Sequence, residues 1–140
     1  MGSIIYYYRK GQTALSLVFL IGGIAILVGV TLAFLTTSFL NVSSGFESGQ
    51  RASAVANAGA EDGMLQLIRN KSFSDVSGYP VPVGSNSATV TVTQNSPVAG
   101  QATIVSNAVV SLYRRQVKAV VSIDSTTGQV NVISWGETNL

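Results

Sequence analysis

The sequence lacks both cysteine and histidine, and it carries few charged residues for a chain of 140 residues. Without cysteine the chain can form no disulfide bond. Without either residue type, a zinc or copper site would have none of its usual thiolate or imidazole ligands. Charged residues make up 10% of the chain, whereas about 25% is usual for a soluble domain. We therefore expect no metal and no other cofactor.

The net charge is also small, at +2 from 8 basic and 6 acidic residues. A nucleic-acid-binding domain usually carries a pronounced basic patch. The basic cluster here, formed by Arg114, Arg115 and Lys118, holds only three charges and is typical of a solvated strand face. Nucleic acid is therefore not an expected partner.

The shortage of charged residues arises mainly near the N-terminus, where residues 11–46 contain no acidic or basic side chain. Residues 14–35 are mostly Leu, Ile, Val, Phe, Ala and Gly. A helix of that length spans about 33 Å, and the hydrocarbon core of a bilayer is about 30 Å thick. Residues 36–40 are softer and would reach the far interface. The pattern predicts a membrane-spanning helix.

Arg9 and Lys10 lie immediately before this apolar run. Basic residues favour the cytoplasmic side, so the leader is expected inside and the remainder of the chain outside. An uncleaved signal anchor would have the same orientation. A cleaved secretory signal is a second alternative, with a weak site at residues 31–33 and a mature start near Phe34. The apolar core of such signals is usually about 7–15 residues, shorter than this run.

The junction resembles a known type of leader. Arg9, Lys10 and Gly11, followed by residues 12–15, are similar to the class III leader of type IV pilins and type II secretion pseudopilins. The resemblance implies that a prepilin peptidase cuts after Gly11 and that Gln12 is then methylated. The mature chain would have 129 residues (140 minus 11). The implied partners are this peptidase, the membrane, other pilin-like subunits and their assembly machinery.

The chain departs from this family at one position. Major subunits usually carry a glutamate at the fifth mature position, where it is thought to pair with the N-terminal amine of a neighbouring subunit. Ser16 stands at that position here. Some minor pilins and pseudopilins, notably those at a filament tip, tolerate the absence of the glutamate. The resemblance therefore implies a minor subunit.

Residues 41–70 contain no proline and continue the helical pattern. Apolar and small residues recur every three or four positions, which predicts one helical stripe. Glycine within a helix costs about 1 kcal/mol relative to alanine, so the glycines in this segment need tertiary support. Small residues permit close approach of another element, and the simplest partner is the chain's own sheet. The stripe comprises Ala52, Val55, Ala56, Gly59, Ala60, Gly63, Met64 and Leu67. The resemblance to minor-pilin helices extends to about residue 70.

The C-terminal half changes to a composition rich in Val, Thr, Ile and Ser, which is typical of strands. Serine, proline and glycine in residues 71–84 predict a loop. Alternating apolar residues predict strands over residues 88–93, 101–106, 113–124 and 129–135. We expect an α+β fold, with the long N-terminal helix packed on a small antiparallel sheet of three or four strands.

No group of residues has the arrangement of a catalytic site. Glu61 and Asp62 are adjacent and would point about 100° apart on a helix, which is a poor geometry for paired acid–base catalysis. Ser16 lies in the predicted span, and the chain has no histidine to activate it. We therefore do not expect an enzyme.

The sequence divides into a leader (residues 1–11), a transmembrane half of the helix (12–40), an amphipathic half (41–70) and the sheet (71–140), with the last two forming one globular head. The prediction is a minor pilin or pseudopilin subunit. It would begin as a single-pass inner-membrane protein with its head outside, and then enter a filament at the cell surface or in the periplasm. The alternative is a non-filamentous, membrane-anchored binding module. Pilus and secretion pseudopilus remain open, as do the roles of tip initiator and adhesin.

Overall fold

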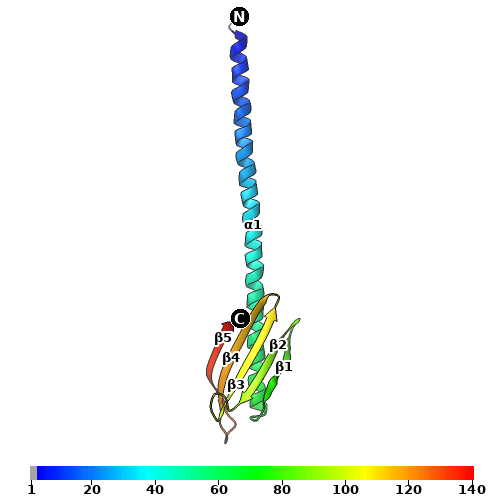
Figure 1. The fold of residues 1–140 in the computed structure, drawn as a ribbon, viewed down its shortest axis with the longest axis vertical. Coiled ribbons are helices and arrows are strands. Elements are labelled where there is room, and N and C mark those ends of the chain that lie inside the picture. The colour runs from blue at the N-terminus through cyan, green and yellow to red at the C-terminus, as the bar shows by residue number, and fades with distance from the viewer. Residues whose placement is uncertain (1–2) are drawn as a thin grey trace. The chain divides into compact units, whose positions relative to one another are not determined.

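The computed structural model describes the backbone of residues 3–140 and the side chains of residues 13–138 and 140. Helix α1 (Ser3–Arg69) is followed by five strands (Figure 1). They are β1 (Asp75–Val83), β2 (Asn86–Gln94), β3 (Gln101–Val110), β4 (Tyr113–Ile123) and β5 (Val130–Asn139). The chain forms two compact units, Met1–Ser44 and Gly45–Leu140. We call the second unit the head, and residues 45–69 of α1 the head helix.

The head has the predicted α+β arrangement, with one helix against an antiparallel sheet. The strands follow one another across the sheet in the order β1-β2-β3-β4-β5, and every neighbouring pair is antiparallel. Figure 1 shows them side by side against the head helix. The β3–β4 turn lies at the end of the sheet where the head helix begins, since Tyr113 lies against Gly45. Short turns between sequential strands give this meander, in which each pairing is local in the chain.

The sheet has five strands, so the predicted count of three or four is wrong. The additional strand is β1, in a segment that the sequence predicted to be a loop. Proline cannot donate to a ladder and is confined to edge strands, and β1 is such an edge. Pro80 and Pro82 pair with Thr89 and Ser87 at alternate positions of the strand, so both prolines stand in the same orientation.

An irregularity at the start of β1 explains its loop-like composition. The pairing shifts register between Asp75 and Tyr79. Gly78 has a φ of +90°, a conformation that side-chain-bearing residues rarely adopt. The Asp75 carboxylate accepts hydrogen bonds from Ser77 Oγ (2.8 Å) and Gly78 N (2.9 Å). These bonds lower the pKa of Asp75.

The core lies between the head helix and one face of the sheet. The predicted stripe is confirmed: Ala52, Val55, Ala56, Ala60 and Leu67 are buried against the sheet. The facing strand residues alternate as a half-buried strand requires. They are Ala88, Val90, Val92, Ala102, Ile104, Ala108, Val117, Ala119 and Val121.

Two glycines allow the helix to approach the sheet closely. A Cβ atom built on Gly59 would lie 2.7 Å from the Ala88 Cβ and in closer conflict with Ser106 Oγ. One built on Gly63 would lie 2.7 Å from Ile104 Cγ2. Because real Cβ atoms do not come this close to other atoms, any larger residue would force the helix away from the sheet. The tertiary support that the sequence required for these glycines is therefore the sheet itself.

Polar contacts join the head helix to β5, which is otherwise largely exposed. Trp135 Nε1 donates to Asn57 Oδ1 (3.1 Å), and Ser53 Oγ donates to Glu137 Oε2 (2.8 Å). The other Glu137 oxygen lies 3.5 Å from Arg115 Nε. The β4–β5 pairing skips one residue of β5, because Val120 pairs with Ser134 and Val121 with Val132. This bulge lets β5 bend while Trp135 still reaches the helix.

On the opposite side of the head helix, Tyr79 is tied to Asp62. The half-buried Tyr79 hydroxyl donates to Asp62 Oδ2 at 2.9 Å, and its ring packs edge-on against Phe73 at 5.8 Å between centroids. Burial of the hydroxyl, and then its bond to the Asp62 carboxylate, raise the pKa of Tyr79 above its ordinary value of 10.0. The neutral phenol is therefore the form that the folded head favours.

We predict a loss of stability at alkaline pH that depends on this tyrosine. A pKa raised in the folded state gives stability that is fully present below the unfolded pKa, near 10.0, and is lost as pH rises beyond it. The melting temperature of the wild-type head should therefore fall above about pH 10, more steeply than that of Tyr79→Phe. Fluorescence of Trp135, the single tryptophan, reports the transition. Tyr113→Phe serves as the control, because it removes a tyrosine hydroxyl elsewhere in the head. Parallel slopes for the wild type and Tyr79→Phe would contradict the prediction.

Candidate functional site

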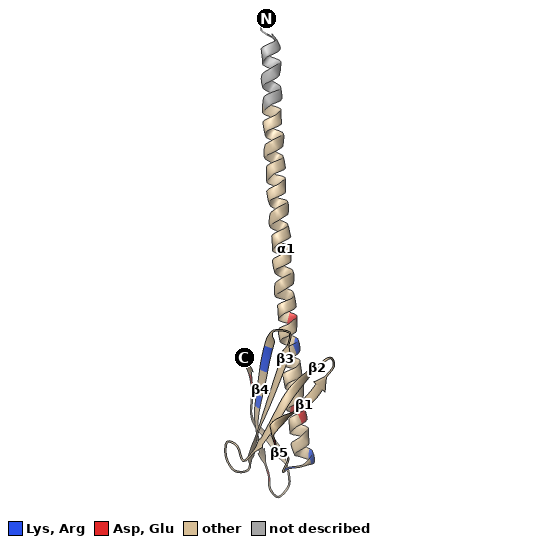
Figure 2. Cartoon of the chain, turned by 45° about the vertical axis from the view of Figure 1, so that its right-hand side comes forward, with Lys and Arg blue, Asp and Glu red and all other residues tan. Residues whose placement is uncertain are grey.

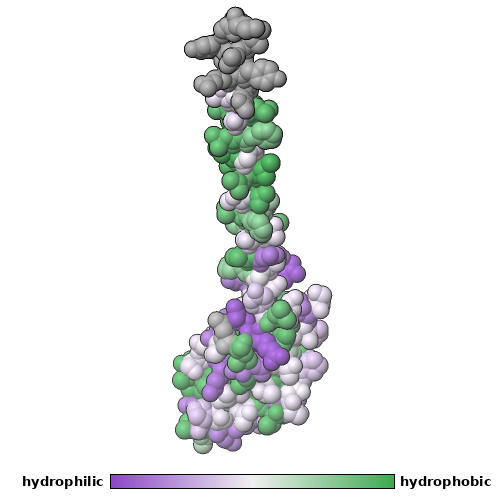
Figure 3. Space-filling model, turned by 45° about the horizontal axis from the view of Figure 1, so that its top comes forward, coloured by the Kyte–Doolittle hydropathy of each residue, from purple (hydrophilic) through white to green (hydrophobic). Residues whose placement is uncertain are grey.

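The N-terminal unit presents apolar side chains on every side of α1. All residues from 13 to 44 are exposed, including Leu15, Phe19, Ile26, Phe34 and Phe39. Figure 3 shows a predominantly hydrophobic surface on the face of this segment that is in view. A helix that is apolar all round needs a core, a membrane or other helices to cover it. None of the candidate membrane span within Thr13–Arg69 is buried by the chain itself, so the cover must come from outside.

Three threonine hydroxyls within this segment are hydrogen-bonded to the backbone of the helix. Thr31, Thr36 and Thr37 each donate from Oγ1 to the backbone carbonyl four residues earlier, at 2.7, 2.9 and 3.0 Å. A hydroxyl without a partner would be costly in a hydrocarbon phase, and these bonds remove that cost. The helix is therefore suited to a bilayer despite its threonines, and the chain fits a membrane-anchored protein with a single candidate span among the described residues.

The residues predicted for processing lie mostly outside the described side chains. Arg9, Lys10, Gly11 and Gln12 fall within the backbone of α1, but their side chains are not described. Ser16, which the resemblance places at the position of the assembly glutamate, is exposed on the helix. The predictions of cleavage after Gly11 and of methylation at Gln12 therefore stay predictions.

Among the side chains that the structure describes, charge is confined to the head. Figure 2 shows no acidic or basic residue on the described part of α1 until the head helix begins. Glu47 and Arg51 then pair at 2.6 Å, both well exposed. Such a pair on a helix surface stabilises it by only about 0.3–0.5 kcal/mol. The charge distribution thus separates an uncharged segment from an ordinary hydrated domain.

The basic cluster of the sequence does not form a single patch. Alternate residues of a strand face opposite sides of the sheet, so β4 divides the three cations. Arg115 lies on the helix side with Glu137 as its partner, at 3.5 Å. Arg114 and Lys118 are exposed on the other side. This division agrees with a solvated strand face and gives no concentrated anion-binding surface.

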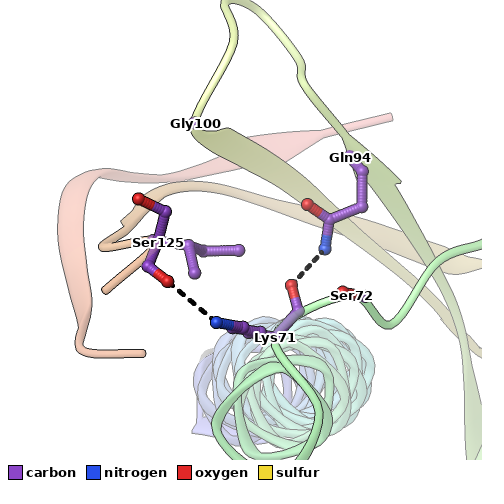
Figure 4. Close-up of a pocket in the computed structure, with 6 residues that line it drawn as sticks. Lys71, Ser72, Gln94, Gly100 and Ser125 are labelled. Atoms are coloured by element: carbon purple, nitrogen blue, oxygen red, sulfur yellow. Dashed lines mark hydrogen bonds between the residues drawn. The ribbon is translucent and has the colours of Figure 1, made fainter. Parts of the chain in front are cut away.

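An open pocket lies where the head helix ends, lined by Lys71, Ser72, Gln94, Gly100, Ile123 and Ser125 (Figure 4). Its polar groups bond to one another. Lys71 Nζ donates to the Ser125 carbonyl at 2.8 Å, and Gln94 Nε2 donates to the carbonyls of Lys71 and Phe73 at 3.0 and 2.8 Å. The lining contains no nucleophile paired with a base, which a nucleophilic catalyst requires. These bonds serve to attach the end of the helix to the sheet.

Among the described residues, no three side chains of the metal-ligating types His, Cys, Asp and Glu lie close enough together to hold a metal ion. Comparison of the chain with protein-family models, with curated proteins and with solved structures finds no match. The candidate functional site is therefore the exposed apolar segment of α1, which the head follows in the sequence.

Proposed function

We propose that this chain is a minor pilin-like or pseudopilin-like subunit, assembled through its apolar N-terminal helix. The observation that carries the proposal is the uncharged helical segment, exposed on all sides and preceded by Arg9, Lys10 and Gly11. Neighbouring helices of other subunits can replace lipid around such a segment. The small head would then lie outside the packed helices.

The chemistry of the segment limits what drives assembly. Apolar side chains gain little when they leave lipid for another apolar surface, so association depends on close packing. Gly22, Gly23 and Gly29 have nothing near the position of a Cβ atom, so they offer bare backbone to a neighbouring helix. Without the glutamate that Ser16 replaces, the subunit would lack a charge pair to set its register. This fits a minor position and a filament extended by an external motor.

Processing of the N-terminus tests the proposal. The full chain should be expressed in membranes with and without a prepilin peptidase, and its intact mass measured. We expect peptidase-dependent loss of the first 11 residues, which leaves 129 residues, 140 minus 11, together with an added methyl group on Gln12. A Gly11→Val variant should remain uncut, whereas Gly22→Ala should be cut as the wild type is. An intact wild-type chain would favour the anchored binding module, and a start near Phe34 would indicate release by signal peptidase.

A further inference from the structure

The turn between β3 and β4 exposes an apolar residue where a polar one is expected. Leu112 is 94% exposed, the highest value among the large apolar residues of the described chain. Turns on a solvated surface favour Gly, Asn, Asp and Ser. Val109 and Tyr113 flank it and are also exposed. We call residues 109–113 the tip.

The tip lies beside the start of the head helix. The Tyr113 ring is in contact distance of the positions where Cβ atoms on Gly45 and Gly49 would stand. Phe46, on the same helical turn as Gly45, is 70% exposed. One end of the head therefore carries several uncovered apolar side chains, two of them aromatic.

The short connection between the apolar run and the head limits how far this end of the head can lie from a membrane. The apolar run of the sequence closes at Leu40, only five residues before Gly45. Five residues span at most about 17 Å when fully extended. Whatever the orientation of the head, the start of its helix therefore stays close to the surface of any bilayer that the span crosses.

Charges at this end are compatible with a phospholipid surface. Its acidic side chains are engaged, since Glu47 pairs with Arg51 and Glu137 with Arg115. Arg114, the next residue after the tip, has no ion pair among the described side chains and is exposed. Tyrosine and phenylalanine favour the membrane interface, and arginine favours anionic headgroups.

We propose that the tip inserts into the outer interface of the membrane that the chain spans, with Leu112 among the acyl chains and Arg114 at the headgroups. The contact holds the head against the bilayer before any filament forms. It therefore does not rest on the proposed filament role, and the two can fail separately. Extraction into a filament would have to release the tip.

A single-site probe tests this inference in the full-length chain. Because the chain has no cysteine, Leu112→Cys gives a unique site for an environment-sensitive dye. Val98→Cys is the matched control, since Val98 is an exposed residue (54%) in the β2–β3 turn at the other end of the sheet. Each labelled chain is reconstituted in vesicles with nitroxide-labelled lipid. At position 112 we expect the nitroxide to reduce the dye emission to about half, because the dye would lie at the depth of an interfacial apolar group. At position 98 we expect little quenching.

Composition of the vesicles tests the role of Arg114. Quenching at position 112 should increase when about 30% anionic phosphatidylglycerol is added to phosphatidylcholine, and the increase should disappear in 1 M salt, where the screening length is about 3 Å. Arg114→Gln should abolish the increase and keep the quenching in neutral vesicles. Equal quenching at positions 112 and 98 would overturn the inference. So would a blue shift at position 112 that appears only at high protein-to-lipid ratio and without quenching, because it would place the tip against another copy of the chain.

Discussion

A Gly59→Ala variant should lower the melting temperature of the head by about 5–10 °C, because a single methyl group would separate the head helix from the sheet. The new Cβ would lie 2.7 Å from the Ala88 Cβ, 3.0 Å from Val90 Cγ2 and closer still to Ser106 Oγ. Overpacking of this kind usually costs about 1–3 kcal/mol. The gain in helix propensity is at most about 1 kcal/mol, so we expect the clash to dominate. The melt can be followed by Trp135 fluorescence of the full chain in detergent.

Gly49→Ala is the matched control, since it makes the same substitution in the same helix. A Cβ on Gly49 would meet only ordinary contacts, at 3.4 Å from an Arg115 nitrogen and 3.7 Å from the Tyr113 ring. Its melting temperature should be unchanged or slightly higher, because only the helix propensity changes. If both variants melt at the same temperature, the inference that the helix and the sheet approach too closely at Gly59 to admit a methyl group is wrong.

A double variant locates the clash. Ser106 Oγ is buried and has no hydrogen-bond partner among the described residues, so Ser106→Ala alone should cost little or nothing. In the Gly59→Ala background the same change removes the closest conflicting atom. We expect partial recovery of the melting temperature, because the contact with Ala88 remains.

Removal of the helix should have a larger effect: a fragment of residues 71–140 should not fold, whereas residues 45–140 should. Without the head helix, Val90, Val92, Ile104, Val117 and Val121, all fully buried in the head, would face water on one side of the sheet. Burial of a Val or Ile side chain contributes about 1.5–3 kcal/mol, so the loss approaches about 10 kcal/mol. The total stability of a domain is only about 5–15 kcal/mol.

The comparison of the two fragments is direct. Residues 45–140 should show one cooperative thermal transition by circular dichroism, and residues 71–140 should show none. Adding the helix as a separate peptide should restore part of the structure, since it supplies the missing half of the core. A cooperative transition from residues 71–140 alone would show that the sheet is stable without its helix.

The sequence predicted the parts of the head in which periodicity is strong. The stripe from Ala52 to Leu67 repeats every three or four residues, and β4 alternates from Val117 to Val121, so each pattern has one structural solution. It did not predict β1, because Pro80 and Pro82 indicate a loop unless the segment is known to be an edge. Position in a sheet is a tertiary property that composition does not contain.

The tip was not predicted for a related reason. Its signal in the sequence is a single apolar residue, Leu112, after Ser111, which has a positive φ of 57°. A leucine near a strand end usually belongs to the core, and only the pairing of Val110 with Tyr113 shows that it stands in the turn. For the leader, the sequence remains the source of the prediction, because the side chains of Arg9, Lys10 and Gly11 are not described.

The two edges of the sheet have a consequence for crowding. An open edge strand is a template on which another chain can add, and copies concentrated in a membrane or a filament meet such edges often. On β1 the prolines remove two donors, and on β5 the bulge at Ile133 interrupts the regular spacing. Either feature hinders strand addition. The head can therefore be held at high local concentration with little tendency to polymerise through its own strands, so that any ordered assembly is left to the apolar helix.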